Sequence, residues 1–185
     1  MIKAPEFYDT FHQHADVLEQ AGFKRKSNNK YTSRNGNAIQ IILNKWGWTE
    51  EYGWSFFIRL VDIAYVSRGP QQPHTDIDPM TLADKKLISP ETVEEFYKSY
   101  NHKHPGLYEN IQIMPFAFYD QVQLKKVLDQ FLPAVAQAAK DWEAWRFEQR
   151  DKPAPAQRSP VELAVAREAA LRQMEQAGLK VERPE

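Results

Sequence analysis

The stretch that decides the fold is residues 37–65, NAIQIILNKWGWTEEYGWSFFIRLVDIAY. Isoleucine and leucine fill every second position from Ile39 to Leu43, and this period of two predicts a strand with one strongly apolar face. The run from Trp54 to Val61 is β-branched or aromatic on nearly both faces, which is typical of a central strand. Glycines between the two runs can reverse the chain. The stretch therefore predicts a long antiparallel hairpin at the centre of a sheet.

Aromatic residues crowd the predicted turn of this hairpin. Three of the five tryptophans lie between positions 46 and 54. We expect Trp54 to cap the core of the sheet, whereas Trp46 and Trp48 can equally cap the core or anchor a partner. Tyr52 belongs to the same turn, and we include it with Trp46 and Trp48 among the candidate partner-binding residues.

The bulk composition excludes several classes of protein. The chain has 185 residues, of which 42% are hydrophobic and 26% charged, as in soluble globular proteins. A net charge of −1 gives no general attraction to nucleic acid or membranes, and the lack of cysteine excludes a thiol nucleophile or thiolate metal site. The start, MIKAPEFYDT, has no basic region followed by an apolar run, and no window is apolar enough to span a bilayer. We therefore expect a cytoplasmic protein.

A proline-rich segment near the C-terminus divides the chain. Residues 151–159, DKPAPAQRS, predict a semi-stiff linker. Residues 160–185 predict a helical appendage. A capping box formed by Ser159 and Glu162 marks its start. We expect residues 1–150 to form a single domain.

On the N-terminal side of the hairpin, the elements carry clear local signals. Pro5 suits the first turn of a helix and Gly22 suits a left-handed cap, so we predict one helix of about four turns between them. The next residues predict two short strands around Ser27–Asn29. Asn35–Gly36 is a strong signal for a turn into the central hairpin.

On the C-terminal side, residues 66–89 contain three prolines and no clear period, which predicts a long loop. A helix then begins with Ser89 as its N-cap and Pro90 at its first position. Residues 111–118 predict an edge strand, because Pro115 cannot donate to a ladder on both sides.

A last domain helix is predicted from Asp120, its cap, to about Gln149, and Pro133 should kink or restart it. Together the elements predict an α+β fold. We expect a mainly antiparallel sheet of four to five strands between Phe23 and Val66, packed against the N-terminal and C-terminal helices.

Catalytic motifs are absent from the sequence. It has no Gly-x-Ser-x-Gly elbow, phosphate loop or dinucleotide fingerprint. Asp62 on the central strand could do acid–base work if burial raised its pKa. A carboxylate there more often pairs with a neighbour such as Arg59 or faces solvent. We assign no catalytic residue and no cofactor, and we favour a protein that is not an enzyme.

The histidines give no well-defined metal site. His12 and His14 are two residues apart on a predicted helix, so their side chains point in different directions. A second set could supply nitrogen and oxygen ligands to zinc or a related metal; it consists of His74, Asp76, Asp78, His102 and His104. Solvated loop histidines are the better interpretation of such unspecific spacing, and we assign no metal.

Six basic residues form a cluster with no acid between Gln20 and Glu50: Lys24, Arg25, Lys26, Lys30, Arg34 and Lys45. One interpretation is a protected sheet edge, since lysines discourage edge pairing. The other is a patch that binds phosphate or an acidic protein. The cluster lacks aromatic residues at RNA-binding spacing, which argues against nucleic acid.

The order of several motifs resembles a bacterial family known only as a domain of unknown function. The matching motifs are Leu18-x-x-x-Gly22-Phe23-Lys24-Arg25-Lys26, Tyr31-x-x-Arg34 and Ile39-Gln40-Ile41-Ile42-Leu43-Asn44-Lys45. The similarity covers residues 5–65 and extends more weakly to about residue 150. It implies the architecture given above and supplies no catalytic residue. In general character the chain is also similar to immunity proteins that neutralise bacterial toxins.

We therefore expect a non-catalytic cytosolic protein-binding module, of the kind that occludes a toxin. The candidate partner-binding residues are Trp46, Trp48, Tyr52, Arg68, His74, Asp76 and Asp78. One alternative is a small enzyme or a ligand- or metal-binding domain with a pocket beneath the loop at 67–88. Another is phosphate or nucleic-acid binding through the Lys24–Lys45 cluster.

Overall fold

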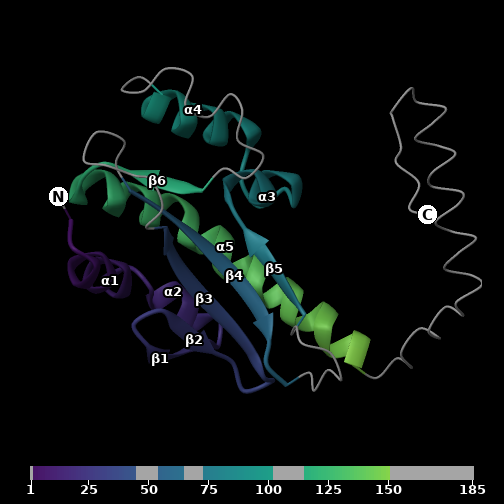
Figure 1. Ribbon diagram of the computed structural model, residues 1–185. Helices are drawn as coiled ribbons and strands as arrows, with labels where there is room; N and C mark the ends of the chain where they lie inside the picture. The colour runs from purple at the N-terminus through teal and green to yellow at the C-terminus, as the bar shows by residue number, and fades with distance from the viewer. Residues whose placement is uncertain (1, 45–53, 65–72, 102–114, 151–185) are drawn as a thin grey trace, which may run out of the picture. The chain divides into compact units, whose positions relative to one another are not determined.

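Figure 1 shows the computed structural model, which describes residues 2–44, 54–64, 73–101 and 115–150. The described residues contain helices and an antiparallel sheet, so the predicted α+β class is confirmed. The domain part of the chain is Met1–Arg150. The predicted linker at 151–159 and the helix after it lie outside the described residues.

The central hairpin is present as predicted. Strand β3 (Asn37–Asn44) pairs antiparallel with β4 (Trp54–Asp62) along its whole length, from Asn37 opposite Asp62 to Asn44 opposite Ser55. Its aromatic turn lies outside the described residues. The hairpin carries the rest of the sheet on its two sides.

In the part of the chain that the structure describes, the sheet has six strands, in the order β1-β2-β3-β4-β5, and β6 also pairs with β4. The two short strands predicted before the hairpin are β1 (Lys24–Ser27) and β2 (Lys30–Thr32). The predicted edge strand appears as β6 (Phe116–Phe118), while 111–114 lie outside the described residues. Strand β5 (His74–Ile77) completes the sheet, which therefore extends beyond the predicted boundary at Val66.

The prediction of a long loop over 66–89 was wrong for its second half. β5 pairs with Ile58–Val61 of β4, and helix α3 (Pro79–Asp84) follows directly. Asp78 caps this helix by accepting a hydrogen bond from the Thr81 amide at 2.7 Å, and Pro79 occupies its first turn. An aspartate followed by proline is an N-terminal helix signal, but both elements are too short to show a period.

The single N-terminal helix that we predicted is two helices, α1 (Ala4–Gln13) and α2 (Asp16–Gln20). The backbone turns at His14 and Ala15, whose amides donate to carbonyls three residues back. This break allows Leu18 to be fully buried together with Phe7 and Phe11 of α1. The cap was predicted correctly, because Gly22 has φ +94° and the Phe23 amide donates to Leu18 O at 3.0 Å.

The two longest helices follow the capping signals. Ser89 Oγ accepts from the Thr92 amide at 3.2 Å before α4 (Pro90–Asn101), and Asp120 Oδ1 accepts from the Gln123 amide at 2.8 Å before α5. Helix α5 (Gln121–Arg150) is one helix of 30 residues, so the predicted restart at Pro133 does not occur. Buried side chains on both sides of Pro133 hold the helix to the sheet despite the missing hydrogen bond.

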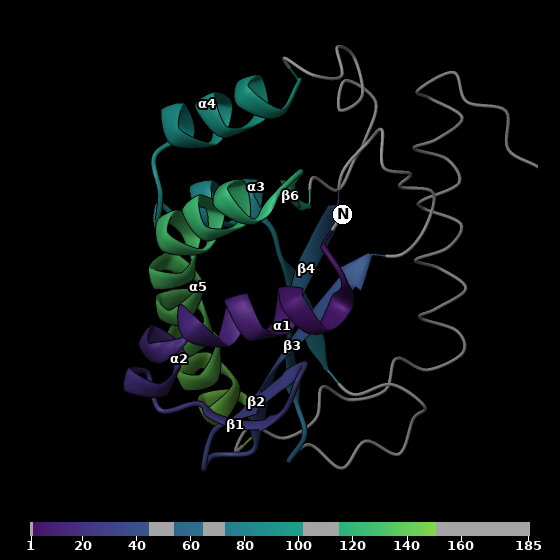
Figure 2. The same ribbon diagram turned by 90° about the vertical axis from the view of Figure 1, so that its left-hand side faces the viewer.

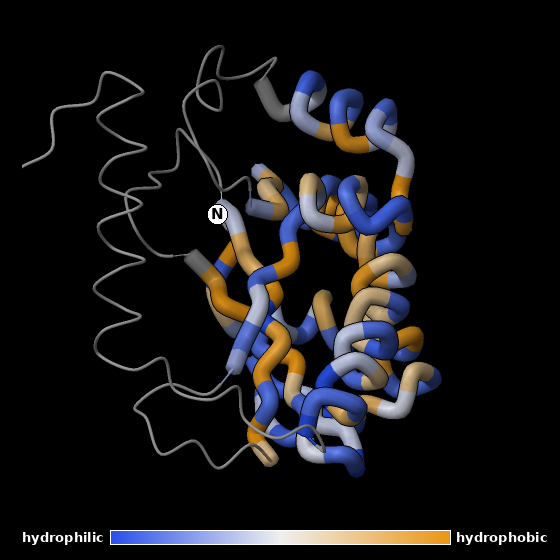
Figure 3. The backbone as a smooth tube through the Cα atoms, turned by 90° about the vertical axis from the view of Figure 1, so that its right-hand side faces the viewer, coloured by the Kyte–Doolittle hydropathy of each residue, from blue (hydrophilic) through white to orange (hydrophobic). Residues whose placement is uncertain are grey.

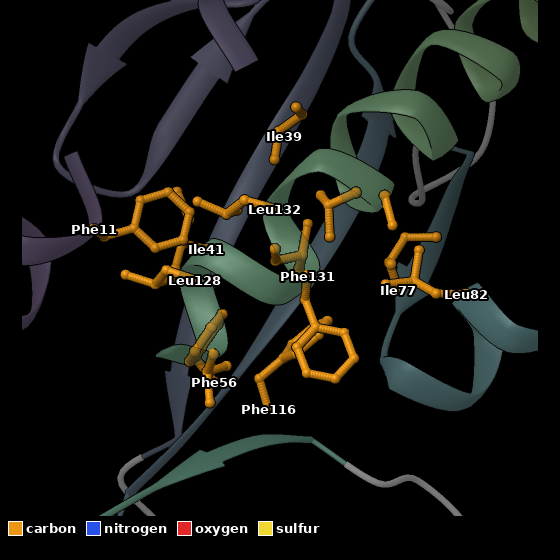
Figure 4. Packing of buried hydrophobic residues seen from close by; sticks show 14 of the residues in the cluster. Phe11, Ile39, Ile41, Phe56, Ile77, Leu82, Phe116, Leu128, Phe131 and Leu132 are labelled. Atoms are coloured by element: carbon orange, nitrogen blue, oxygen red, sulfur yellow. The ribbon is translucent and has the colours of Figure 1, made fainter. Parts of the chain in front are cut away.

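The core lies between the sheet and the helices α1 and α5 (Figure 2). Side chains from α1, β3, β4 and α5 converge in Figure 4, where Phe11, Ile41, Phe56 and Phe131 are labelled. Each buried side chain of this size stabilises the fold by about 1.5–3 kcal/mol. In Figure 3 hydrophobic and hydrophilic positions alternate along the turns of α5, as an amphipathic helix requires. Within the described ranges, no helix combines the length and the apolar character needed to cross a membrane.

Candidate binding surface

Only three of the seven predicted partner-binding residues can be placed. Trp46, Trp48, Tyr52 and Arg68 lie outside the described residues. His74 is exposed on β5. Asp76 accepts two hydrogen bonds from Arg59, at 2.6 and 2.9 Å, and Asp78 caps α3. The two aspartates therefore serve separate structural purposes, and the hydrogen bond with Arg59 and the positive charges of Arg59 and His74 lower the pKa of Asp76.

No group of three or more potential metal ligands occurs among the residues that can be described. His102 and His104 lie outside them. As predicted, His12 and His14 point to different partners. His12 Nδ1 lies 2.7 Å from the Tyr31 hydroxyl, and His14 Nδ1 lies 2.6 Å from an Asp129 carboxylate oxygen. Burial lowers the pKa of His12 and raises the pKa of Tyr31 to about 12.

Asp62 does not take the partner that the sequence suggested. Arg59 pairs with Asp76, whereas Asp62 is fully buried and binds Arg146 and Arg150 from the last turns of α5. Burial alone would raise the pKa of Asp62, but the hydrogen bonds and charges of the two guanidinium groups outweigh it and hold the pKa below its usual range. Asp62 is therefore a structural anion, and the acid–base role considered for it does not apply.

A basic hollow of about 580 Å³ opens at the end of the sheet where β1 begins and β2 ends. Its lining residues come from four places along the chain: the cap after α2, strands β1 and β2, the turn before β3, and the last turns of α5. They are Gly22, Lys24, Lys26, Thr32, Ser33, Arg34, Asn35 and Glu143. We call this site the basic hollow.

Three of the six clustered basic residues line the basic hollow, namely Lys24, Lys26 and Arg34. Among the described residues, none forms an ion pair with any of these three. One carboxylate, Glu143, also lines the hollow. The local balance of charge is therefore positive, and hydroxyl and amide groups stand beside the cations.

The other three basic residues of the cluster are arranged differently. Arg25 donates a hydrogen bond to Asn28 Oδ1 at 2.9 Å. Its charge adds to the lowering of the His12 pKa by burial and offsets part of the rise that burial causes in the pKa of Tyr31. Lys30 lies on β2 opposite Gln40. Lys45 lies outside the described residues. The structure thus divides the cluster between the basic hollow and the strands beside it.

The turn that carries Arg34 is held rigidly from two sides. Ser33 and Asn37 exchange hydrogen bonds at 2.9 and 3.2 Å, and the amides of Ile63 and Ala64 donate to Gly36 O at 2.8 and 2.9 Å. Arg150 reaches the same turn by donating to the carbonyl oxygen of Asn35. The wall of the basic hollow is therefore fixed before any ligand arrives.

Two contributors to this site, Glu143 and Arg150, could not be predicted from the sequence. Glu143 accepts a hydrogen bond from Asn37 Nδ2 at 3.2 Å, which ties α5 to the start of β3. Both residues lie more than a hundred positions from the turn in the sequence. No local pattern connects them with it, because only the path of α5 brings them there.

The chain was compared with protein-family models, curated proteins and solved structures, and none of the three comparisons gives a match. The resemblance to a bacterial family of unknown function stays a prediction. The basic hollow is therefore the feature of the described residues that bears on function.

Proposed function

We propose that the chain is a non-catalytic, cytosolic protein-binding module that occludes an acidic surface of a partner protein, as an immunity protein occludes a toxin. The observation that supports this proposal is the basic hollow, in which Lys24, Lys26 and Arg34 have no ion-pair partner among the described residues. Complementary charge of this kind speeds association and selects the partner more than it adds affinity.

The side chains that line the basic hollow suit the binding of an anionic group. Its lysine, arginine, threonine, serine and asparagine side chains can donate to carboxylate or phosphate oxygens. A rigid sheet and a clamped turn present these donors with little loss of conformational entropy, which favours recognition by a preformed surface. The aromatic turn at 45–53, predicted from sequence, stays a second candidate contact.

A phosphate-bearing ligand is the second candidate, because the same donors suit it and the hollow has the volume of a small-molecule site. The small enzyme or metal-binding domain considered from sequence has less support. Among its proposed polar groups, Asp76 is engaged by Arg59 and Asp78 caps α3.

The test is affinity purification of the tagged full-length protein from the cells that produce it. One variant reverses the charge of the hollow, Lys24→Glu with Lys26→Glu and Arg34→Glu. Its matched control makes the same change on exposed α5 positions, Lys125→Glu with Lys126→Glu and Lys140→Glu. We expect wild type and control to retain an acidic protein in a one-to-one molar ratio with the tagged chain, and we expect salt to release that protein. The hollow variant should not retain it.

Equal recovery by both variants would contradict the proposal. If nuclease removes the recovered material, the ligand of the basic hollow is nucleic acid and not a protein. Circular dichroism and urea unfolding of each variant establish that the charge reversals leave the fold intact.

A further inference from the structure

Strand β1 is the edge strand of the sheet as far as the chain is described. Within the described residues the strand order ends at β1, which pairs with β2 on its other side. All four of its residues, Lys24–Ser27, are exposed. An edge strand presents unpaired amide and carbonyl groups at every second residue, and these can pair with a strand from another chain.

The charges on this edge select the kind of strand that can pair with it. Lys24, Arg25 and Lys26 are consecutive, so a second copy of the same edge would bring like charges together across the pair. An acidic strand would instead bring opposite charges together. The same basic residues therefore oppose self-association and favour an acidic partner.

The edge and the basic hollow share two side chains. Lys24 and Lys26 belong to β1 and line the hollow, and Arg34 lies in the wall beyond them. Successive residues of a strand point to opposite faces, so carboxylates at alternate positions of an added strand would point to one side. A segment that ran along β1 could thus direct its carboxylates to these cations.

We propose that β1 receives an extended acidic segment of the partner protein, which adds to the sheet as a further strand and places alternate carboxylates at Lys24, Lys26 and Arg34. This inference rests on the proposed function and specifies how the partner is held. Backbone hydrogen bonds to β1 position the segment, and the side chains of the hollow select its charge.

The geometry of β1 limits the length of the recognised segment. β1 has four residues, and its pairing with β2 is irregular between Arg25 and Ser27. At about 3.3 Å per residue, four residues span about 13 Å. The segment therefore needs no more than about four paired residues, with acidic side chains two residues apart.

The experiment uses the isotopically labelled full-length protein and a seven-residue probe peptide of alternating glutamate and valine, acetylated and amidated at its ends. The control peptide has the same side chains and charge but carries N-methyl groups on its central glutamate and on both neighbouring valines. These groups remove donors from both edges of the peptide, so it cannot add as a strand. Nuclear magnetic resonance titration measures both affinities.

We expect the probe to protect amides of Lys24–Ser27 from hydrogen exchange and to give cross-strand contacts with β1. The N-methylated peptide should bind about fivefold to thirtyfold more weakly, as expected for the loss of one or two backbone hydrogen bonds, depending on which edge of the peptide faces β1. Lys24→Ala with Lys26→Ala should weaken the probe by a similar factor, whereas Lys125→Ala with Lys126→Ala on α5 should leave its affinity unchanged.

Each other outcome has a definite meaning. Equal, salt-sensitive binding of both peptides would overturn strand addition and leave the proposed function intact. Binding of inorganic pyrophosphate without binding of either peptide would overturn this inference and identify a phosphate site. A dimer that sedimentation detects, with intermolecular contacts at Lys24–Ser27 by nuclear magnetic resonance, would assign the edge to a second copy. No binding of any probe would also overturn the inference, and the affinity purification then decides separately on the proposed function.

Discussion

Arg150, the last residue of α5, donates a hydrogen bond through Nε to Asp62 Oδ2, at the end of β4, at 3.1 Å. Arg146 donates to the same oxygen at 3.0 Å. The three side chains are 0%, 19% and 11% exposed for Asp62, Arg150 and Arg146. This buried ion cluster fastens the end of the longest helix to the central hairpin and, through Asn35, to the turn beside the basic hollow.

Replacing Asp62 should be costly, because it leaves two partly buried guanidinium groups without their anion. We expect Asp62→Asn to lower the free energy of unfolding by about 3–5 kcal/mol. Urea unfolding at neutral pH measures this change. Asp76→Asn is the matched control, since its ion pair with Arg59 is more than one-third exposed on both sides and should contribute less than about 1 kcal/mol. Similar losses in the two variants would contradict the role given to the buried cluster.

Gly36 should tolerate substitution less well than Gly22. Both have positive φ, +78° and +94°, but a Cβ on Gly36 would lie 2.3 Å from Ala64 Cβ, whereas a Cβ on Gly22 would meet nothing within 4 Å. We expect Gly22→Ala to cost about 1–2 kcal/mol from backbone strain alone, and Gly36→Ala to cost about 1–3 kcal/mol more. Urea unfolding of both variants compares them. An equal cost would mean that the contact with Ala64 relaxes freely.

The elements that could be predicted from sequence are those with strong local signals. The period of two in the hairpin, the cap at Gly22 and the Asn35–Gly36 turn all act within a few residues, and all are present. β5 and α3 were missed because four and six residues are too few to show a period. Their prolines then favoured a loop, although Pro79 occupies the first turn of a helix.

The candidate site was only partly predictable, for a different physical reason. The density of basic residues between Gln20 and Glu50 showed where positive charge gathers. Which three line the basic hollow depends on the turn at 33–36 and on the approach of α5. Arg150 pairs with a carboxylate 88 positions away, and Arg59, the nearer candidate in sequence, pairs with Asp76 instead.

Acid should destabilise the protein through His12. Burial and the nearby charge of Arg25 lower the pKa of His12 in the folded state, so the unfolded chain binds the proton more tightly. The contribution of His12 to stability is therefore fully present above the pKa of an unfolded histidine, about 6.5, and is lost as the pH falls below that value. Urea unfolding between about pH 7.5 and pH 5 should show wild type losing stability relative to His12→Gln. A constant difference over this range would contradict the prediction.

Pro133 should weaken the helix that it interrupts. It lies inside α5, lacks the amide that would donate to the carbonyl of Asp129, and is exposed. A proline inside a helix lowers the free energy of unfolding by about 3 kcal/mol, and its restriction of the unfolded chain offsets about 1 kcal/mol of this loss. We therefore expect Pro133→Ala to stabilise the fold by about 2 kcal/mol in urea unfolding. A loss of stability would show that a bend at this position is needed for α5 to follow the sheet.

Glu143 should oppose the acidic partner of the basic hollow, because it is the carboxylate among the lining residues. In Glu143→Gln the side chain keeps an oxygen that can accept the hydrogen bond from Asn37, so the fold should be unchanged. Removing one negative charge from the rim should strengthen binding of the glutamate–valine peptide by about threefold to fivefold at low salt. The gain should shrink when salt is raised to about 0.3 M, because screening shortens the reach of each charge.

Glu148→Gln is the matched control for this last change, since Glu148 is exposed on the same helix and does not line the hollow. It removes the same charge from the whole protein. A general effect of net charge would strengthen peptide binding equally in both variants, whereas a site at the basic hollow requires the gain only in Glu143→Gln. The comparison thus separates attraction by the protein as a whole from recognition at Lys24, Lys26 and Arg34.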